Sequence, residues 1–375
     1  MNPDFRDYVP ERKVADKLVD HYFRTMESTH RILHTIHFKR EYEQYWANPL
    51  ATPTSSVVKI LLVMAIGSCF HQEDDHISVR SMAQQWVYSA QSWIASPFEK
   101  SRLNLSGLQV QCLLLLARET NGVGGDLIWI AAGSLLRTAF QMGFHRDPQY
   151  FPKMSIMHQE MRRRLWATVL ELAVQTSVDA GMPPLLSTTE YDTLPPSNID
   201  DCDFSETTTE PPIPKPENTF TQSSIQIQLL KTIGVRLQIS QHINNFRIDP
   251  SYDETLSLGS KIGNAVKEAT LLMSSYPAHL PHPTSLHRNL ADIILRRFVL
   301  AIHKPSAVKS TKDSKYYYSR KICLDTSVII LSHSGSESGV TIEPGRMDDY
   351  TRLKFVCGGF YKEIFLAAGL ILATE

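Results

Sequence analysis

Residues 126–204 read DLIWIAAGSLLRTAFQMGFHRDPQYFPKMSIMHQEMRRRLWATVLELAVQTSVDAGMPPLLSTTEYDTLPPSNIDDCDF, which is two strong helix patterns, a polar turn between them and an irregular acidic loop. In the first pattern apolar residues recur at helical spacing and make one stripe, at Ile128, Ala131, Ala132, Leu135, Leu136, Ala139 and Met142. Asp126 is expected to cap the start of this helix, and Gly143 is placed to end it in a left-handed conformation. The second helix has its inward stripe at Met161, Leu165, Val169, Leu172, Ala173 and Thr176.

Three consecutive arginines, Arg162 to Arg164, run beside the second stripe, with Glu160 and Glu171 nearby. They are the densest basic cluster of the chain, and their acidic flanks favour a solvated or internally paired helix face. The net charge is −1 and the isoelectric point is about 6.9. Without a basic patch or arm, the sequence indicates no global electrostatic attraction to nucleic acid.

Helix patterns cover most of the remaining chain, and no segment shows a convincing alternation of period two. We expect helices at Val14–His37, Val57–Phe70, Ser78–Ile94, Leu108–Arg118, Ile225–Phe246, Tyr252–Ser275, Ser285–His303, Tyr316–Ser332 and Met347–Ala373. Val57–Phe70 is apolar on all sides and therefore predicts a central, buried helix, capped by Ser55 or Ser56, while Ser106 is expected to cap Leu108–Arg118. The predicted fold is all-α, with one large irregular helical assembly.

A polar segment interrupts this assembly. Residues 205–224 (SETTTEPPIPKPENTFTQSS) are rich in Thr, Pro and Glu and contain few large apolar groups. Such a segment buries too little apolar surface to offset the entropy lost on ordering, so we expect a mobile, disordered loop. Residues 1–204 are then the first part of one helical domain, and residues 225–375 are the remaining helices of the same domain.

The five cysteines, Cys69, Cys112, Cys202, Cys323 and Cys357, lie far apart, and no CxxC pair occurs. The sequence therefore encodes neither a disulfide framework nor a cysteine zinc site, and reduced, buried thiols are expected. The first residues lack the apolar core of a signal peptide. The longest apolar runs, Val57–Phe70 and Phe355–Ala373, are too short or too interrupted by charge to span a bilayer, so no membrane partner is expected.

Several patterns superficially suggest a catalytic or binding site. His30, His34 and His37 fall at helical spacing on the expected Val14–His37 helix, but metal binding would need a further ligand, so partly exposed histidines are expected. The tripeptide His145-Arg146-Asp147 looks like a kinase catalytic loop, but the Asn that such a loop requires is replaced by Pro152. Instead its polar groups are expected to satisfy the carbonyls that end the preceding helix. Gly122-Val123-Gly124-Gly125 follows a helix rather than a strand and predicts a turn, not a phosphate cradle.

Two further features, acidic clusters and helical tryptophans, could form a metal site or a ligand pocket. The acidic clusters Asp74-Asp75 and Asp200-Asp201-Cys202-Asp203 would suit magnesium-bound diphosphate in a helical terpene-cyclase-like enzyme, but the second ligand motif of that class is absent. Core packing is the expected fate of the helical tryptophans Trp86, Trp93, Trp129 and Trp166, and a ligand pocket is the alternative. The sequence thus assigns no catalytic, cofactor, metal or DNA-binding residue.

Three motifs together resemble the middle homology region of fungal zinc-cluster transcription factors. They are Met142-Gly143-Phe144-His145-Arg146-Asp147-Pro148, Glu160-Met161-Arg162-Arg163-Arg164-Leu165-Trp166 and Leu194-Pro195-Pro196-Ser197-Asn198-Ile199-Asp200-Asp201. Arg12–Trp46 is similar to the family's opening helices, and Arg297–Leu324 resembles a later helix, short loop and Ser-Arg-led helix. The resemblance therefore covers most of the chain.

The resemblance implies a nuclear regulator of transcription in a fungus, acting on a metabolic or secondary-metabolite pathway. In this family a separate N-terminal module of six cysteines holds two zinc ions and contacts DNA. That module is absent here, so zinc and DNA are expected only through a missing N-terminal part. Implied partners are other transcription regulators or a second copy of the chain, with a small-molecule effector possible. The last helix pattern runs to Glu375 without a stop signal, so a C-terminal truncation is expected.

Two alternatives stay open beside that function. The chain could act as written, as a helical interaction or ligand-sensing module that does not touch DNA, a hypothesis motivated by its neutral charge and missing zinc cluster. A terpene-cyclase-like enzyme is a distant third. The sequence otherwise argues against an enzyme, because no nucleophile elbow or glycine-rich phosphate loop occurs.

Overall fold

The chain is mostly helical in the computed structural model, which describes residues 4–96, 99–245, 251–277, 281–335 and 346–374. Those ranges hold fifteen α-helices and no strand, which confirms the all-α fold class. In the first part they are α1 (Arg12–Thr25), α2 (Glu27–His30), α3 (Thr35–Ala47), α4 (Thr54–Gly67), α5 (His76–Ala95), α6 (Leu105–Asn121), α7 (Ile128–Gln141) and α8 (Ile156–Ala180). In the second part they are α9 (Ser224–Lys231), α10 (Ile233–Ile243), α11 (Tyr252–Ser275), α12 (Ser285–Lys309), α13 (Tyr317–Ser332), α14 (Asp349–Val356) and α15 (Gly359–Ala373).

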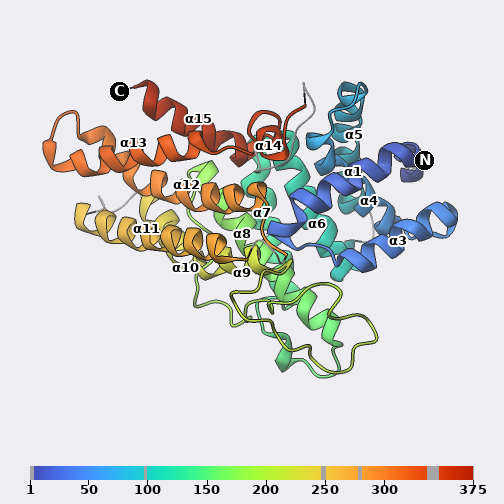
Figure 1. Ribbon diagram of the computed structural model, residues 1–375. Helices are drawn as coiled ribbons and strands as arrows, with labels where there is room; N and C mark the ends of the chain where they lie inside the picture. The colour runs from blue at the N-terminus through green and yellow to red at the C-terminus, as the bar shows by residue number, and fades with distance from the viewer. Residues whose placement is uncertain (1–3, 97–98, 246–250, 278–280, 336–345, 375) are drawn as a thin grey trace.

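The first group of helices packs around α4. This helix contacts α1, α5 and α6 (Figure 1), and each of its residues from Ser56 to Gly67 is buried. A helix that is apolar on every side avoids water only in the centre of such a group. The predicted central helix is therefore confirmed, although Pro53, and neither Ser55 nor Ser56, occupies its N-cap position.

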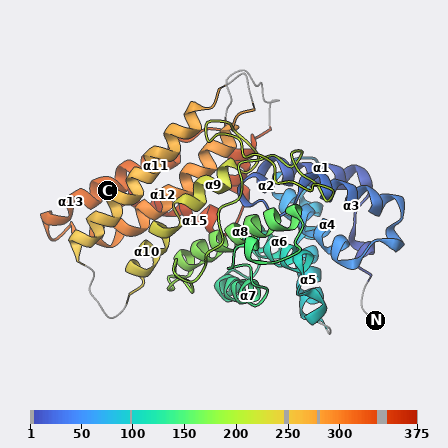
Figure 2. The ribbon, with the colours of Figure 1, turned by 90° about the horizontal axis from the view of Figure 1, so that it is seen from below.

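The second group packs around α12. This helix lies against α11 and α13, and α13 in turn packs against α15 (Figure 2). The bounds predicted for α11, Tyr252–Ser275, are confirmed, and Ser251 caps it by accepting a hydrogen bond from the amide of Glu254 at 3.1 Å. Helix α12 is longer than predicted because it continues past His303 and accommodates Pro305 in its last turns.

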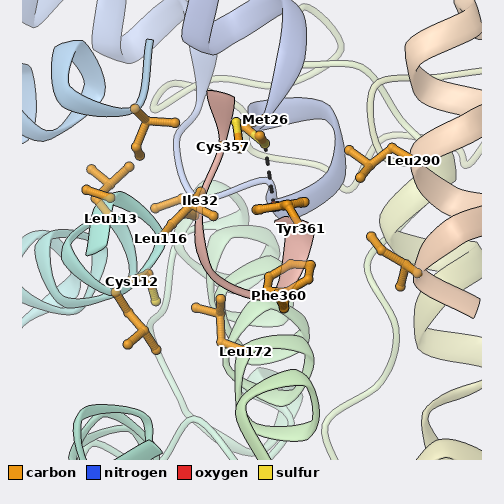
Figure 3. Packing of buried hydrophobic residues seen from close by; sticks show 14 of the residues in the cluster. Met26, Ile32, Cys112, Leu113, Leu116, Leu172, Leu290, Cys357, Phe360 and Tyr361 are labelled. Carbon is orange, nitrogen blue, oxygen red and sulfur yellow. Dashed lines mark hydrogen bonds between the residues drawn. The ribbon is translucent and has the colours of Figure 1, made fainter. Parts of the chain in front are cut away.

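Helix α8 lies between the two groups. It contacts α6 and α7 on one side and α9, α10 and α15 on another. Of its 25 residues, 17 are buried. A single apolar cluster extends from Ala15 to Ala368, and Figure 3 shows a part of it where Leu172 of α8 lies near Phe360 and Leu116. The core therefore includes residues from both sides of the 205–224 segment.

The predicted helix Val14–His37 is wrong in its extent. The chain forms α1 and α2, and Arg31 then adopts the left-handed conformation with φ 47° and ψ 44° before α3 starts at Thr35. Only glycine adopts this conformation without strain, so nothing in the residue types marks the break. Arg31 leaves the helix because its buried side chain has ion-pair partners elsewhere, as described below.

Other helix ends also differ from prediction. Ile225–Phe246 divides into α9 and α10, and its expected end, Phe246, lies outside the described residues. Met347–Ala373 divides into α14 and α15. Asp126 lies in a short 3-10 turn and does not cap α7. Asn104, not Ser106, caps α6 by accepting the amide hydrogen of Gly107 at 2.9 Å.

The segment 205–224 is irregular until α9 begins at Ser224, and Figure 1 shows it as a long excursion beside α8. Asn198 holds its second half by donating side-chain hydrogen bonds to the carbonyls of Lys215, Pro216 and Thr219, at 3.0 to 3.1 Å. The absence of helix there agrees with the sequence. The mobility of the segment stays a prediction.

Within the described residues, no single helix is long and apolar enough to cross a membrane. Helices α14 and α15 pass that test only as a joined pair, across a bend of 84°.

Candidate functional site: three buried charge clusters along helix α8

Helix α8 carries the second of the three sequence motifs and an unusual number of buried charges. Ser155 caps its start by accepting a hydrogen bond from the amide of His158, and Gly181 ends it with φ 61°. Arg164 is fully buried, and Glu160 and Glu171 are only 3% and 6% exposed. Removing a charge from water is costly unless it is paired and hydrogen-bonded. The partners of these residues therefore determine which segments must pack against α8.

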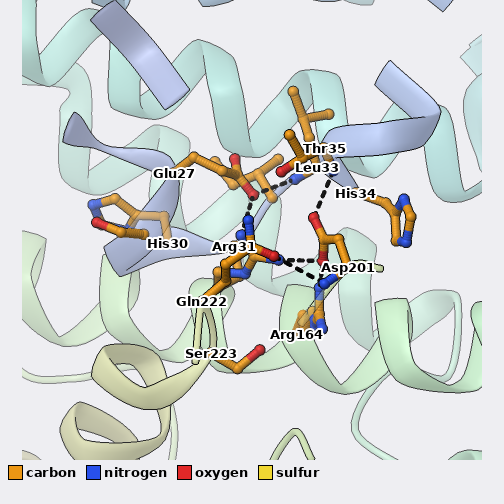
Figure 4. Close-up of polar contacts among 12 residues, drawn as sticks. Glu27, His30, Arg31, Leu33, His34, Thr35, Arg164, Asp201, Gln222 and Ser223 are labelled. Carbon is orange, nitrogen blue, oxygen red and sulfur yellow. Dashed lines mark hydrogen bonds and ion pairs between the residues drawn. The ribbon is translucent and has the colours of Figure 1, made fainter. Parts of the chain in front are cut away.

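The first cluster, the Asp201 cluster, consists of Glu27, Arg31, Glu160, Arg164 and Asp201. Figure 4 shows Glu27, Arg31, Arg164 and Asp201. Arg164 donates from Nη1 to Oδ1 of Asp201 at 2.6 Å and from Nε to Glu160 at 3.1 Å. Arg31 donates to the same Asp201 oxygen. The left-handed turn at Arg31 and the acidic loop after α8 thus meet at one carboxylate.

Backbone groups complete the coordination of Asp201. Its Oδ2 accepts the amide hydrogen of Thr35 at 2.6 Å, and its own amide donates to Oε1 of Gln222 at 2.8 Å. The first turn of α3 is therefore held by a carboxylate, which satisfies an otherwise unpaired amide and complements the helix dipole. Through Asp201, the N-terminal helices and the end of the 205–224 segment share one anchor.

Two carboxyl groups of this cluster have opposite pKa shifts. Burial alone would raise the pKa of Asp201, but attraction to Arg31 and then to Arg164 outweighs it, so the pKa lies well below the usual range. Burial raises the pKa of Glu27 to about 7, and attraction to Arg31 offsets it only in part. Glu27 accepts hydrogen bonds from the Tyr22 hydroxyl and, at 2.9 Å, from the Leu33 amide. Asp201 is thus held ionised, whereas Glu27 titrates near neutral pH.

The second cluster is centred on Asp147, which is fully buried. Arg163 donates to both of its oxygens at 3.0 Å, a bidentate pair. The amides of Gln149 and Leu194 donate to the same carboxylate, each at 3.0 Å. Burial alone would raise the pKa of Asp147, but the hydrogen bonds from Arg163 and the two amides outweigh it and lower the pKa. Asp147 therefore ties the first motif and the start of the third motif to α8.

The remaining arginine of the run, Arg162, closes the end of α7. Gly143 is left-handed with φ 71°, as predicted, and Arg162 donates to its carbonyl at 2.6 Å and to the Met142 carbonyl at 3.2 Å. The expectation that His145-Arg146-Asp147 satisfies these carbonyls is confirmed only in part, because the amide of Arg146 donates to the Gly143 carbonyl at 3.2 Å, whereas the Met142 carbonyl accepts from Arg162. The side chain of Arg146 pairs with Asp192 at 3.1 Å. All three arginines are internally paired, and Arg164 is not solvated.

The third cluster joins α8 to the second group of helices. Arg236 of α10 donates to both oxygens of Glu171, at 2.8 and 2.7 Å. Gln175, one turn further along α8, donates to Glu171 at 2.8 Å and accepts from Arg297 of α12 at 2.6 Å. Arg297 also pairs with Asp179. Successive turns of α8 thus bind helices that follow the 205–224 segment.

The acidic residues that the sequence suggested as metal ligands are paired with basic side chains. Asp200 and Asp203, weighed above as magnesium ligands, both pair with Lys215, at 2.6 and 2.8 Å. Asp75 pairs with His71 at 2.6 Å, at the start of α5. In the part of the chain that the structure describes, no group of three or more His, Cys, Asp or Glu side chains could hold a metal ion.

The three histidines do not share a helix face, because the chain breaks between α2 and α3. His30 is buried with Nε2 at 3.2 Å from the Tyr361 hydroxyl, and His34 is buried edge-on against Phe204. Both were expected to be partly exposed, which is wrong. His37 lies 3.0 Å from Glu206. The glycine turn is confirmed, since Gly122 ends α6 with φ 65°.

The tryptophans have different environments. Trp86 and Trp166 are buried in the core, and Trp86 donates to the Tyr8 carbonyl at 2.8 Å. Trp93 lines a cavity of about 390 Å³ between α5, α6 and α7, which is also lined by Leu114, Leu135 and Arg118. Arg102 lies over the Trp93 ring, 4.7 Å from its centroid. Trp93 therefore lines a pocket, and the binding of a ligand there stays a prediction.

Sequence reasoning missed the partners from outside the motifs: Glu27, Arg31, Arg236 and Arg297. Each is a charged residue within a helix pattern, so the residue type alone predicts a position on the surface. An inward position can be recognised only where a charge falls on the apolar stripe, as for Arg236 between Ile233 and Leu237.

Comparison with known proteins agrees with this arrangement. A profile of the fungal specific transcription factor domain matches residues 19–258. The chain is similar to the transcription factor opdR of Penicillium oxalicum, with 37% identity over 100% of the chain and 48% of that relative. It is 36% identical to the transcription factor lepE of Aspergillus flavus, over 98% of the chain and 44% of the relative.

A further relative is the aspyridones cluster regulator apdR of Emericella nidulans, which is 32% identical over 88% of the chain and 46% of its own length. The chain thus spans about half the length of the curated relatives it matches. No solved structure matches the chain. The domain profile covers more than half of the chain, including all three motifs that the clusters along α8 join, and the chain belongs to the fungal specific transcription factor domain family.

Proposed function

We propose that this chain is the regulatory helical region of a fungal transcription regulator that acts in the nucleus on a secondary-metabolite pathway. The observation that carries the proposal is the family match over residues 19–258, together with relatives named as transcription factors and as a cluster regulator. The three motifs that signal the family are also the segments that α8 holds together. The domain is then a rigid scaffold whose surface, not its interior, meets other proteins.

We propose that the region acts through protein contacts and not as an enzyme. The arginines that make the densest basic run bind internal carbonyls and carboxylates, so they are not available to phosphate groups. The acidic residues that could have held magnesium pair with Lys215. DNA and zinc then belong to a separate module, and other transcription regulators or a second copy are the partners.

A reporter assay tests this function. The chain is fused to an unrelated DNA-binding module, and transcription from a promoter with that module's site is measured in a fungal host. We expect the fusion to be nuclear and to raise or lower transcription relative to the module alone. The control is the same fusion with Arg164→Leu, in which the scaffold is broken. A folded, nuclear fusion that leaves transcription at the level of the module alone would contradict the proposal.

The cavity between α5, α6 and α7 supports a second candidate function, the sensing of a small molecule. Arg118 is 6% exposed and donates to the carbonyls of Val123 and Gly124, at 3.3 and 3.0 Å. No carboxylate in the described ranges forms an ion pair with it. A buried guanidinium beside apolar walls favours an organic anion with an apolar body, and the volume is in the range of small-molecule sites.

Fluorescent probes can test this second candidate. Anilinonaphthalene sulfonate carries an anion on an apolar body, and phenylnaphthylamine is its neutral counterpart. We expect Arg118→Gln to weaken binding of the anionic probe about tenfold and to leave the neutral probe unchanged. Arg137→Gln, on the nearby helix α7, is the matched control. Equal loss of both probes, or no loss of either, would count against an anion site.

A further inference from the structure

Cys69 and Cys357 lie at opposite ends of the chain and meet in the core. Cys69 belongs to the short turn Ser68–Phe70 that follows α4, and Cys357 separates α14 from α15. Both are free thiols and are almost fully buried. Figure 3 shows Cys357 beside Met26, on the side of the core where α14 leads into α15.

The side chains of the two thiols are close enough to influence each other's ionisation. The carbonyl of Thr120 fixes their relative position, because it accepts from Sγ of Cys69 at 3.4 Å and from the amide of Gly358 at 2.8 Å. A Cβ atom at Gly358 would lie 2.8 Å from the backbone nitrogen of Gly122, so only glycine permits this approach to the end of α6. This close approach of the backbone at Gly358 places Cys357 beside Cys69.

Two guanidinium groups lie at the pair. Arg352 donates from Nε to the Cys69 carbonyl at 3.1 Å and from Nη2 to the His71 carbonyl at 2.7 Å. Arg80 donates to the Val356 carbonyl at 3.5 Å. Neither arginine forms an ion pair with a carboxylate in the described parts of the chain. Their positive charge is thus available to stabilise a thiolate, and both arginines are partly exposed although the thiols themselves are buried.

The remaining cysteines lack these features. The side chain of Cys357, and then the charges of Arg80 and Arg352, lower the pKa of Cys69 to about 7 in spite of burial. Burial raises the pKa of Cys112 and of Cys323. Cys202 is exposed, contrary to the expectation of buried thiols, and its pKa is also raised. The buried Cys112 and Cys323 therefore serve as internal controls.

We propose that Cys69 and Cys357 are a reversible redox pair that forms a disulfide when the protein meets a hydroperoxide. The Cys69 thiol first releases its proton, and the thiolate attacks a peroxide oxygen, so that an S–O bond forms and the O–O bond breaks. The leaving oxygen takes up the released proton and departs as water or alcohol. The Cys357 sulfur then attacks the sulfenic sulfur, the S–S bond forms, and hydroxide leaves with the Cys357 proton as a second water. Two thiols lose two electrons and the peroxide gains them.

The disulfide would tie the end of α4 to the turn between α14 and α15, closing a loop that contains most of the chain. A cross-link of this span restricts the unfolded ensemble more than a short one does. Oxidised protein should therefore resist unfolding more than reduced protein. The proposal does not depend on the proposed function in transcription.

The test uses the purified chain with Cys202→Ser, which removes the exposed thiol. The protein is treated with hydrogen peroxide, alkylated, digested without reductant and analysed by mass spectrometry. We expect one cross-linked peptide pair joining Cys69 to Cys357, its loss on dithiothreitol treatment, and a higher urea midpoint for the oxidised form. A cross-link that involves Cys112 or Cys323, or oxidation of Cys69 to sulfinic acid without any cross-link, would overturn the proposal.

A second variant tests the role of the guanidinium without removing a thiol. Arg80→Gln should slow the peroxide reaction of Cys69 several-fold and leave the urea midpoint of the reduced protein unchanged. Arg40→Gln, at a surface pair with Glu206, is the matched control and should leave the rate unchanged. Equal rates for both variants would show that these charges do not activate Cys69.

Discussion

Arg164 and Asp201 form an ion pair in the interior, with Nη1 of the arginine 2.6 Å from Oδ1 of the aspartate. One residue belongs to the arginine run of α8 and the other to the acidic loop that follows it. Arg31 of the N-terminal part shares the same oxygen. Two of the three motifs that identify the family are therefore in direct contact, and the first prediction tests that contact.

Substituting Arg164 with leucine should destabilise the protein by about 3–5 kcal/mol, because Glu160 would be left buried without its counter-charge and Asp201 would keep only Arg31. Urea unfolding followed by circular dichroism measures the change. Arg40→Leu, which removes a surface pair with Glu206, is the matched control and should cost less than about 1 kcal/mol. Equal costs for the two variants would show that the interior pair is not an anchor.

Asp147→Asn should cost about 2–4 kcal/mol at neutral pH, since Arg163 and two backbone amides lose a charged acceptor. The folded state lowers the pKa of Asp147, so its contribution is present above the unfolded pKa and is lost as the pH falls through the folded pKa. The difference between wild type and variant should therefore shrink in acid. A difference that stays constant with pH would contradict the ionised role of Asp147.

Glu27→Gln should change the pH dependence of stability in the opposite sense. The folded pKa of about 7 lies above the unfolded value, so the wild type is most stable below the unfolded pKa and loses stability as the pH rises through 7. The variant lacks this titration, so its unfolding free energy relative to that of the wild type should rise between pH 5 and pH 8 by up to about 3 kcal/mol. The unfolding free energies of both proteins at the two pH values measure it, and parallel profiles would refute it.

Glutamyl endopeptidase should cut the native protein first after Glu206, which is exposed in the 205–224 segment. We propose that residues 1–204 and 225–375 form one domain, and the clusters along α8 support this. The two fragments should then co-elute in size-exclusion chromatography and unfold in one transition. Fragments that separate without denaturant would indicate two domains. Slow cleavage in this segment, compared with cleavage at Glu73 of the α4–α5 connection, would show that the segment is not mobile.

Local patterns predicted the fold where a helix is defined by its own residues. The bounds of α11 follow from a Ser cap and an apolar stripe, and the central position of α4 follows from its lack of a polar face. The left-handed Gly143 likewise follows from residue type. These features depend on spacing and on backbone freedom, which are written in the sequence itself.

The clusters could not be predicted in the same way. Arg31 breaks a continuous helix pattern because Asp201, far along the chain, offers it a buried partner. Glu171 and Arg236 belong to two separate helices, and they become partners only when α8 and α10 pack together. A charge on an apolar stripe, as at Arg236, can indicate a buried position, but it does not identify the partner, because an ion pair between distant segments depends on the tertiary arrangement.

The neighbouring arginines of α8 set a strict register. Each helical residue turns the side-chain direction by about 100°, so Arg162, Arg163 and Arg164 reach three different segments only at one rotational phase of the helix. At the same rotational phase, Glu171 and Gln175 face the helices α10 and α12 that supply their partners. A single inserted or deleted residue between Arg164 and Glu171 would rotate one set of side chains away from its partners. We expect α8 to tolerate many substitutions of shape but no change of length there, whereas residues 205–214, before the contacts with Asn198, should tolerate insertions.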